Sequence, residues 1–190
     1  MVATDVEDRV LQAAKRCCER WGVSKVTIDD IAAEAKVSRA TLYRMSPGGK
    51  DVLFEALRLR ELEEFFCRLM SAIGDPSSLE HLLVAAVVHS ATDLRSDEHL
   101  ALMMASAPGD VVADLTVEGL PRILAAASVF LTPLVEPYLD DADAADMVEV
   151  LVRLVISDYL SPSDRFDLTQ AESTRRFLRT FILPSYVPAR

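Results

Sequence analysis

Apolar residues recur with the period of an α-helix along almost the whole chain. The clearest stripe falls at i, i+3, i+4 and i+7 and occupies one helix face: Ile28, Ile31, Ala32 and Ala35. Thr27 precedes this stripe as a good N-cap, and Val26 is placed to pack on Ile31 as a hydrophobic staple. The pattern therefore predicts a short helix that begins directly after Thr27.

A second short helix follows the first with the same signals. Ser38 is its predicted N-cap, with Val37 and Leu42 placed as the staple. The predicted outward positions are Arg39, Ala40, Thr41, Tyr43 and Arg44. Two short helices joined by a tight turn indicate a helix-turn-helix, which lays its second helix in the major groove of DNA.

The remaining elements are also predicted as helices. The first opens at a capping box, Thr4-x-x-Glu7, and ends at Gly22, with a buried stripe of Val6, Val10, Ala13 or Ala14, Cys17 and Trp21. A long helix over 50–73 follows the break at 46–49. The later segments are 78–94, 97–107, 109–117, 119–139, 143–160 and 169–183, the last with a capping box at Thr169-x-x-Glu172. No convincing period-two alternation is present, so the predicted fold class is all-α.

The sequence predicts two domains that a long helix joins. Residues 1–49 are predicted to form a helix-turn-helix domain, and residues 50–190 a larger helical domain, to which the family resemblance given below assigns effector binding and dimerisation. At about 1.5 Å per residue the long helix spans about 36 Å. It is the predicted route of communication between the two domains.

Charge is divided unevenly between the two ends of the chain, whose net charge is −10. Residues 1–60 contain eleven Lys or Arg and nine Asp or Glu, including all four lysines, whereas residues 61–190 contain nine Arg and twenty-one acids. Affinity for duplex DNA comes largely from neutralised phosphates, so DNA contact is assigned to the N-terminal part. The acidic remainder either repels the duplex and orients the molecule, or serves solubility.

Composition restricts the cellular setting. Three cysteines, two of them adjacent at Cys17 and Cys18, form no obvious disulfide framework. No apolar run reaches the length of a membrane span, and the acidic N-terminus is unlike a signal peptide. We therefore expect a cytoplasmic protein without membrane contact.

Two motifs resemble a known family. Val37-Ser-Arg-Ala-Thr-Leu-Tyr-Arg44, followed by Pro47-Gly-Gly-Lys-Asp-Val-Leu53, is similar to the DNA-binding domain of the TetR/AcrR family of bacterial transcriptional regulators. The resemblance covers roughly residues 5–60. It departs from the family at Met45-Ser46, where an aromatic pair or His-Phe is usual. It implies a homodimeric regulator, most simply a ligand-released repressor of a palindromic operator.

The predicted DNA contacts follow from side-chain chemistry, and the family resemblance implies contacts at the same positions. Arg39 and Arg44 each suit a guanine edge or a phosphate, and Ala40 suits a thymine methyl group. Hydroxyl groups suit phosphate oxygens. Lys50 and a helix N-terminus can hold a phosphate jointly. The complete predicted set is Thr27, Ser38, Arg39, Ala40, Thr41, Tyr43, Arg44 and Lys50.

The C-terminal part carries the predicted subunit contact. Residues 147–156 are apolar except for Glu149 and Arg153, which are i, i+4 partners. A helix apolar nearly all round needs cover on more than one side, either inside the subunit or from a partner. The resemblance implies that the last two long helices form the dimer interface as a four-helix bundle.

The effector site is the least defined prediction. Met and aromatic side chains suit adaptable apolar pockets, and the candidates to line one are Met103, Met104, Phe130, Tyr138 and Tyr159. Each of these also suits an ordinary core position. The acidic domain favours a neutral lipophilic or cationic effector over a small acid.

An enzyme is the main competing class, and no motif supports it. The sequence has no Gly-rich phosphate loop, no G-x-S-x-G, no H-E-x-x-H and no Cys/His set with metal spacing, so neither a cofactor nor a metal is predicted. The other alternative is a helical small-molecule-binding or interaction protein without a DNA function.

Overall fold

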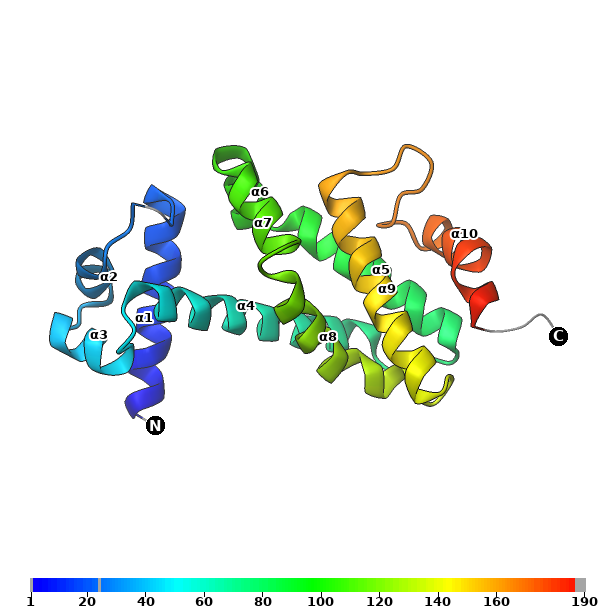
Figure 1. The fold of residues 1–190 in the computed structure, drawn as a ribbon, viewed down its shortest axis with the longest axis horizontal. Coiled ribbons are helices and arrows are strands. Elements are labelled where there is room, and N and C mark those ends of the chain that lie inside the picture. Colours follow the sequence, from blue (N-terminus) through cyan, green and yellow to red (C-terminus); the bar gives the residue numbers. More distant parts are fainter. Residues whose placement is uncertain (1, 24, 187–190) are drawn as a thin grey trace. The chain divides into compact units, whose positions relative to one another are not determined.

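The computed structural model describes residues 2–23 and 25–186, and every regular element in that part of the chain is helical. Figure 1 shows the chain order of the elements. The α-helices are α1 (Val2–Trp21), α2 (Ile28–Ala35), α3 (Arg39–Met45), α4 (Lys50–Ile73), α5 (Leu79–Ser96), α6 (Glu98–Ser106), α7 (Pro108–Leu115), α8 (Leu120–Val135), α9 (Asp141–Leu160) and α10 (Ala171–Phe181). A short 3-10 helix, η1 (Leu183–Ser185), follows α10. The predicted all-α class is confirmed.

The chain divides into two compact units, 1–63 and 64–190. The division falls inside α4, so the first part of this helix packs within the N-terminal unit and its last part within the C-terminal unit. The functional boundary at residue 50 remains a prediction.

The N-terminal unit is built around α1. Buried residues on α1, α2, α3 and the start of α4 form one apolar cluster, which includes the complete predicted stripe of α2. Trp21 was predicted to join this core and does not, since it is 45% exposed. The reason is its position: α1 ends at Trp21, and the chain turns away at Gly22, which has a φ of 77°.

Two predicted helix starts are wrong. Helix α1 already begins at Val2, so Thr4 lies inside it, and the side chain of Thr4 is outside the described ones. At α10 the N-cap is Gln170 rather than Thr169, whose hydroxyl instead donates to Asp167 Oδ1 at 2.7 Å. The Thr169 hydroxyl is therefore bonded to Asp167 and does not form the predicted capping box.

The C-terminal unit has α5 and α9 at its centre. Each buries eight residues, and α8 and α10 pack against them. Charged pairs connect these helices: Arg95 on α5 donates to Asp158 on α9 at 2.7 Å, and Arg179 on α10 donates to Glu80 on α5 at 2.6 Å. The predicted Glu149–Arg153 pair forms on the surface of α9, with an Nη2–Oε1 distance of 2.7 Å.

Within the described residues, no single helix is long and apolar enough to cross a membrane. The bent pair of α7 and α8, with 47° between them, meets the length and composition criteria only when the two helices are taken together.

Candidate DNA-binding interface

Helix α2 begins at a reciprocal cap. The Thr27 hydroxyl oxygen accepts from the Asp30 backbone N–H at 3.2 Å, and Asp30 Oδ2 accepts from the Thr27 backbone N–H at 2.9 Å. The Thr27 hydroxyl also donates to Asp30 at 2.6 Å. These bonds lower the pKa of Asp30, so the carboxylate that holds the helix start stays charged at neutral pH.

The turn between α2 and α3 depends on one left-handed residue. Lys36 has a φ of 55° and ends α2, with its backbone N–H directed at Ala33 O and Ala32 O. This conformation ends the helix and places Ser38 three residues after Ala35, ready to start α3. The Lys36 side chain is exposed. We did not single out this lysine from the sequence, where nothing distinguishes it from other surface lysines.

Helix α3 exposes four of its seven residues. Ser38 is its N-cap, as predicted, and the Ser38 hydroxyl accepts from the Thr41 backbone N–H at 3.0 Å. Leu42 is completely buried and is the only buried residue of the seven in α3. Arg39, Ala40, Tyr43 and Arg44 are exposed, and Thr41 is half-buried. Leu42, with Met45 packed against the core cluster, thus fixes α3 to the unit, while the four exposed side chains remain available for contact.

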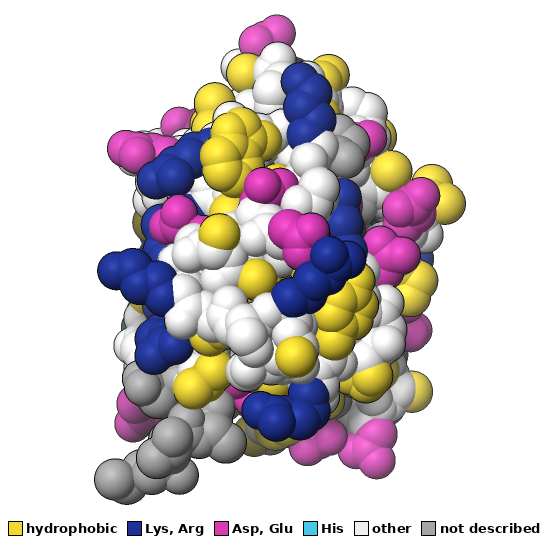
Figure 2. All heavy atoms as spheres, turned by 90° about the vertical axis from the view of Figure 1, so that its left-hand side faces the viewer, with side chains coloured by type: hydrophobic (Ala, Val, Ile, Leu, Met, Phe, Trp, Pro, Cys, Tyr) yellow, Lys and Arg dark blue, Asp and Glu magenta, His cyan; other side chains and the backbone are white. Residues whose placement is uncertain are grey.

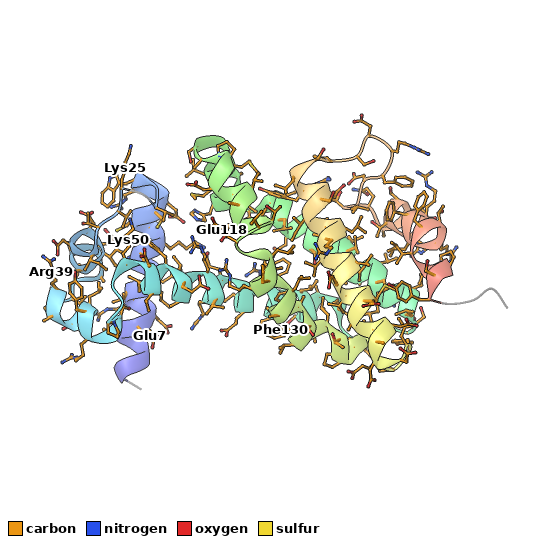
Figure 3. The ribbon with its side chains drawn as sticks, viewed as in Figure 1. Glu7, Lys25, Arg39, Lys50, Glu118 and Phe130 are labelled. Atoms are coloured by element: carbon orange, nitrogen blue, oxygen red, sulfur yellow. The ribbon has the colours of Figure 1, made fainter. Side chains whose placement is uncertain are left out.

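Arg39 at the start of α3 contacts two neighbours. Its Nη1 donates to Asp29 Oδ2 on α2 at 3.1 Å, and its guanidinium carbon lies 5.6 Å from the Tyr43 ring centroid (Figure 3 labels Arg39). Hydrogen bonding with Tyr43 and then the charge of Asp29 raise the pKa of Arg39. Asp29 was not among the predicted site residues, because its contact with Arg39 depends on how α2 and α3 cross.

Lys50 occupies the first turn of α4, after a tight glycine turn. A Cβ at Gly48 would lie 2.1 Å from Val52 Cγ2, so a larger residue there would require the Val52 side chain to move, and Gly49 has a φ of 73°. The Lys50 ammonium lies 5.6 Å from the Phe54 ring centroid, on the buried side of the helix start. Lys50 is labelled in Figure 3. Lys50 is thus the first residue of α4, whose first turn leaves backbone N–H groups without partners inside the helix.

The face that carries α2 and α3 has mixed charge. Figure 2 shows Lys and Arg side chains spread over it, with Asp and Glu side chains among them. Part of the basic charge is used within the unit, because Arg16 and Arg20 on α1 both contact Glu34 at 2.8 and 3.4 Å. Arg44, Lys25 and Lys36 are exposed.

Comparison with known proteins connects this geometry to a family. Residues 10–57 match the sequence profile of the bacterial regulatory proteins of the tetR family. HTH-type transcriptional regulators of Mycobacterium tuberculosis and Mycobacterium bovis are 32% and 33% identical over 102 residues. These matches span 54% of this chain and 51% of each relative, so the chain spans about half the length of these relatives.

The N-terminal domain of this chain therefore belongs to the tetR family of bacterial regulatory proteins.

Solved structures of the TetR family share the complete fold. The TetR-family repressor AlkX of Dietzia sp. strain DQ12-45-1b is 22% identical, with a TM-score of 0.67 over 92% of this chain and 94% of AlkX. The multidrug binding protein EbrR, in complex with imidazole, is 21% identical, with a TM-score of 0.61 over 92% of this chain and 93% of EbrR. At this identity the likeness concerns the fold.

The departure from the TetR pattern at the end of α3 is partly filled by Met45. This side chain is half-buried and packs against the core cluster of the N-terminal unit. Ser46 is 6% exposed, and its backbone N–H donates to Leu42 O at 2.8 Å, which ends the helix. Met45 thus supplies apolar packing where the family usually has an aromatic.

The five candidate effector residues lie on α6, α8 and α9 and in the turn after α8. Phe130 stacks on Phe66, with ring centroids 5.3 Å apart, and the Tyr138 hydroxyl donates to Pro76 O at 3.0 Å. Tyr159 is half-buried, and burial raises its pKa. Met103 and Met104 are half-buried on α6.

A cavity of about 130 Å³ lies between α4 and α5. Its lining residues are Phe65, Arg68, Leu69, Ala72, His89, Thr92, Asp93 and Ser96. None of them is one of the five Met and aromatic candidates. Within the described residues, no group of three or more His, Cys, Asp or Glu side chains is arranged to hold a metal ion.

Proposed function

We propose that this TetR-family chain is a sequence-specific, DNA-binding transcriptional regulator that acts as a homodimer, most simply a repressor that a small molecule releases. The exposure of α3 is the observation that carries the proposal. Leu42 anchors the helix, while its arginines, Tyr43 and Ala40 remain on the surface next to the capped start of α2. A helix that served only the core would bury a stripe of its length.

The proposed DNA contacts are the predicted ones. Arg39 and Arg44 are exposed and can reach base edges or phosphates, whereas Lys50 and the N-terminus of α4 suit one phosphate. The Thr27 and Ser38 hydroxyls each form a helix cap. A phosphate bound at either cap would accept hydrogen bonds from backbone N–H groups at the same helix N-terminus. Thr41 Oγ1 lies 2.8 Å from Ser38 Oγ and belongs to the same polar group.

The proposed dimer forms through α9 and α10. Phe181 at the end of α10 is 53% exposed and joins an aromatic cluster with Phe166 and Phe177, at centroid distances of 5.8 and 5.1 Å. An exposed aromatic surface beside a long central helix suits burial against a second copy. A two-fold dimer would place two α3 helices in successive major grooves, about 34–36 Å apart, on a palindromic operator.

The proposed effector binds the C-terminal unit. AlkX is described as implicated in biodegradation of n-alkanes and EbrR as a multidrug binding protein. These descriptions support a lipophilic or cationic ligand for the present acidic unit. Because α4 is continuous from Lys50 to Ile73, a ligand that prefers one position of its C-terminal part would bias the position of its DNA-binding start.

A gel-shift experiment tests the DNA function. The probe is the duplex upstream of the chain's own gene, and the control is an unrelated fragment of equal length. We expect preference for the upstream duplex, with affinity falling about a thousandfold between about 50 and about 200 mM salt. No preference at any salt concentration would instead favour a helical small-molecule carrier. Sedimentation equilibrium tests the dimer, for which we expect twice the mass of the chain.

A further inference from the structure

Two neighbouring aspartates at the start of α2 have different roles. Asp30 is engaged in the cap with Thr27, through three hydrogen bonds of 2.6–3.2 Å. Asp29 takes no part in that cap. Its carboxylate accepts from Arg39 Nη1 at 3.1 Å, across the helix-turn-helix, and its side chain is 61% exposed.

Arg39 is held from both sides. Asp29 binds one end of its guanidinium, and the Tyr43 ring, one turn further along α3, lies against it at 5.6 Å. With a side-chain exposure of 62%, Arg39 is otherwise surrounded by solvent. The two contacts therefore select one direction for a long side chain that would sample many rotamers.

The first turn of α2 favours an acid at position 29, but neither folding stability nor DNA affinity accounts for its contact with Arg39. An ion pair exposed to this extent contributes little to folding. A carboxylate on the proposed DNA face also repels phosphates and weakens binding to every duplex. The remaining physical effect is on Arg39: the carboxylate limits where the guanidinium lies and competes with phosphates for it.

We propose that Asp29 is a positioning residue that directs Arg39 toward a base edge and away from the phosphate backbone. It lowers affinity for all DNA and increases discrimination between sequences. Guanine recognition by arginine requires a fixed, bidentate approach, whereas a phosphate accepts the guanidinium from many directions. This inference rests on the proposed DNA function.

The test compares Asp29→Asn with the unmutated protein on two duplexes. One duplex is selected from a random pool by the unmutated protein, and the other is a shuffled duplex of the same composition. We expect Asp29→Asn to bind the shuffled duplex more tightly and to lower the selected-to-shuffled affinity ratio about tenfold. The salt dependence on the shuffled duplex should steepen by about one, because the released Arg39 gains a phosphate.

Three further variants separate positioning from charge and from folding. Glu7→Gln removes the same charge from an exposed position on α1 and should leave the affinity ratio unchanged (Figure 3 labels Glu7). Asp29→Glu keeps the carboxylate and should restore most of the ratio. In an Arg39→Ala background, Asp29→Asn should no longer change the ratio, because the arginine that it positions is absent.

Other results would overturn the inference in distinguishable ways. If Asp29→Asn tightens both duplexes equally, Asp29 is a repulsive charge and nothing more. If its effect on the ratio persists without Arg39, the route through that arginine is wrong. If the unmutated protein enriches no sequence from the pool, the proposed function fails, and this inference fails with it.

Discussion

Arginines serve different purposes in the two units. In the described part of the C-terminal unit most of them hold helices together: Arg68 pairs with Asp93, Arg95 with Asp158, Arg122 with Asp114, and Arg175 and Arg179 with Glu80. In the N-terminal unit Arg16 and Arg20 do the same with Glu34, but Arg44 extends from α3 into solvent. For contact with DNA, the position of a basic residue in the chain therefore matters less than whether an acid of the same unit already binds it.

This contrast refines the charge argument from the sequence. The C-terminal unit is acidic, yet its acids also serve as partners for its arginines. A cation available to DNA is one that no carboxylate of its own unit holds, and Arg39 is the intermediate case, because Asp29 holds it in the open. Substitutions at these ion pairs, at Arg44 and at the helix caps can break or sharpen the comparison.

The largest expected effect follows removal of Arg95. Its partner Asp158 has a side-chain exposure of only 5%, so Arg95→Met leaves a buried carboxylate without its cation. We expect a loss of about 2–3 kcal/mol in the free energy of unfolding, measured by urea denaturation.

Arg68→Met is the matched control for Arg95→Met. The Arg68–Asp93 pair is similarly short, at 2.8 Å, but its side chains are 58% and 39% exposed. It should cost no more than about 1 kcal/mol. Equal losses in the two variants would show that burial of Asp158 does not set the strength of the pair.

Removal of Arg44 should leave folding intact and weaken DNA binding. Arg44→Ala removes an exposed cation from α3, so we expect a loss of about 1–3 kcal/mol on the preferred duplex if Arg44 reads a base. Fluorescence anisotropy on preferred and unrelated duplexes measures this loss. An equal loss on both would identify a phosphate contact, and no loss on either would remove Arg44 from the interface.

Sequence reasoning was most successful where structure is determined locally. The caps at Thr27 and Ser38, the apolar stripe of α2 and the bounds of α4 are set by residues within one turn of each other, and all are observed. The pairing of Glu149 with Arg153 is local as well. Trp21 shows the limit, because its exposure depends on where the chain turns after α1.

Contacts between distant helices could not be predicted. Asp29 with Arg39, and Arg95 with Asp158, depend on how helices cross, and many acids in the sequence were equally plausible partners. The cavity between α4 and α5 combines residues from 65 to 96, whereas the sequence pointed to Met and aromatic residues further along the chain. For the same reason a DNA-binding face could be predicted from one segment of the sequence, whereas an effector site could not.

The two helix caps on the proposed DNA-binding face should contribute similar, smaller amounts to stability. Ser38→Ala removes the acceptor for the Thr41 backbone N–H, and Thr27→Ala removes the acceptor for the Asp30 backbone N–H. We expect each to cost about 1 kcal/mol of stability in thermal denaturation. Replacement by glycine should cost less, and a glycine variant as unstable as the alanine variant would argue against a capping role.

The smallest effects concern two glutamates that each receive two arginines from a neighbouring helix, Glu34 in the N-terminal unit and Glu80 in the C-terminal unit. Hydrogen bonds from Arg16 to Glu34 and from Arg179 to Glu80 lower the pKa of each carboxyl below its ordinary value of 4.5. A lowered folded-state pKa means that the stabilisation is fully present above about pH 4.5 and is lost as the pH falls through the lower, folded value.

Glu34→Gln and Glu80→Gln should each therefore reduce stability at pH 7 and flatten its decline toward pH 3, as measured by denaturation across that range. The exposed arginines of the two units have different roles, but the arginine contacts to Glu34 and to Glu80 should respond to acid alike. If only Glu80→Gln alters the dependence of stability on pH, ion pairs between helices stabilise the C-terminal unit alone. The arginines of the N-terminal unit would then serve mainly its surface.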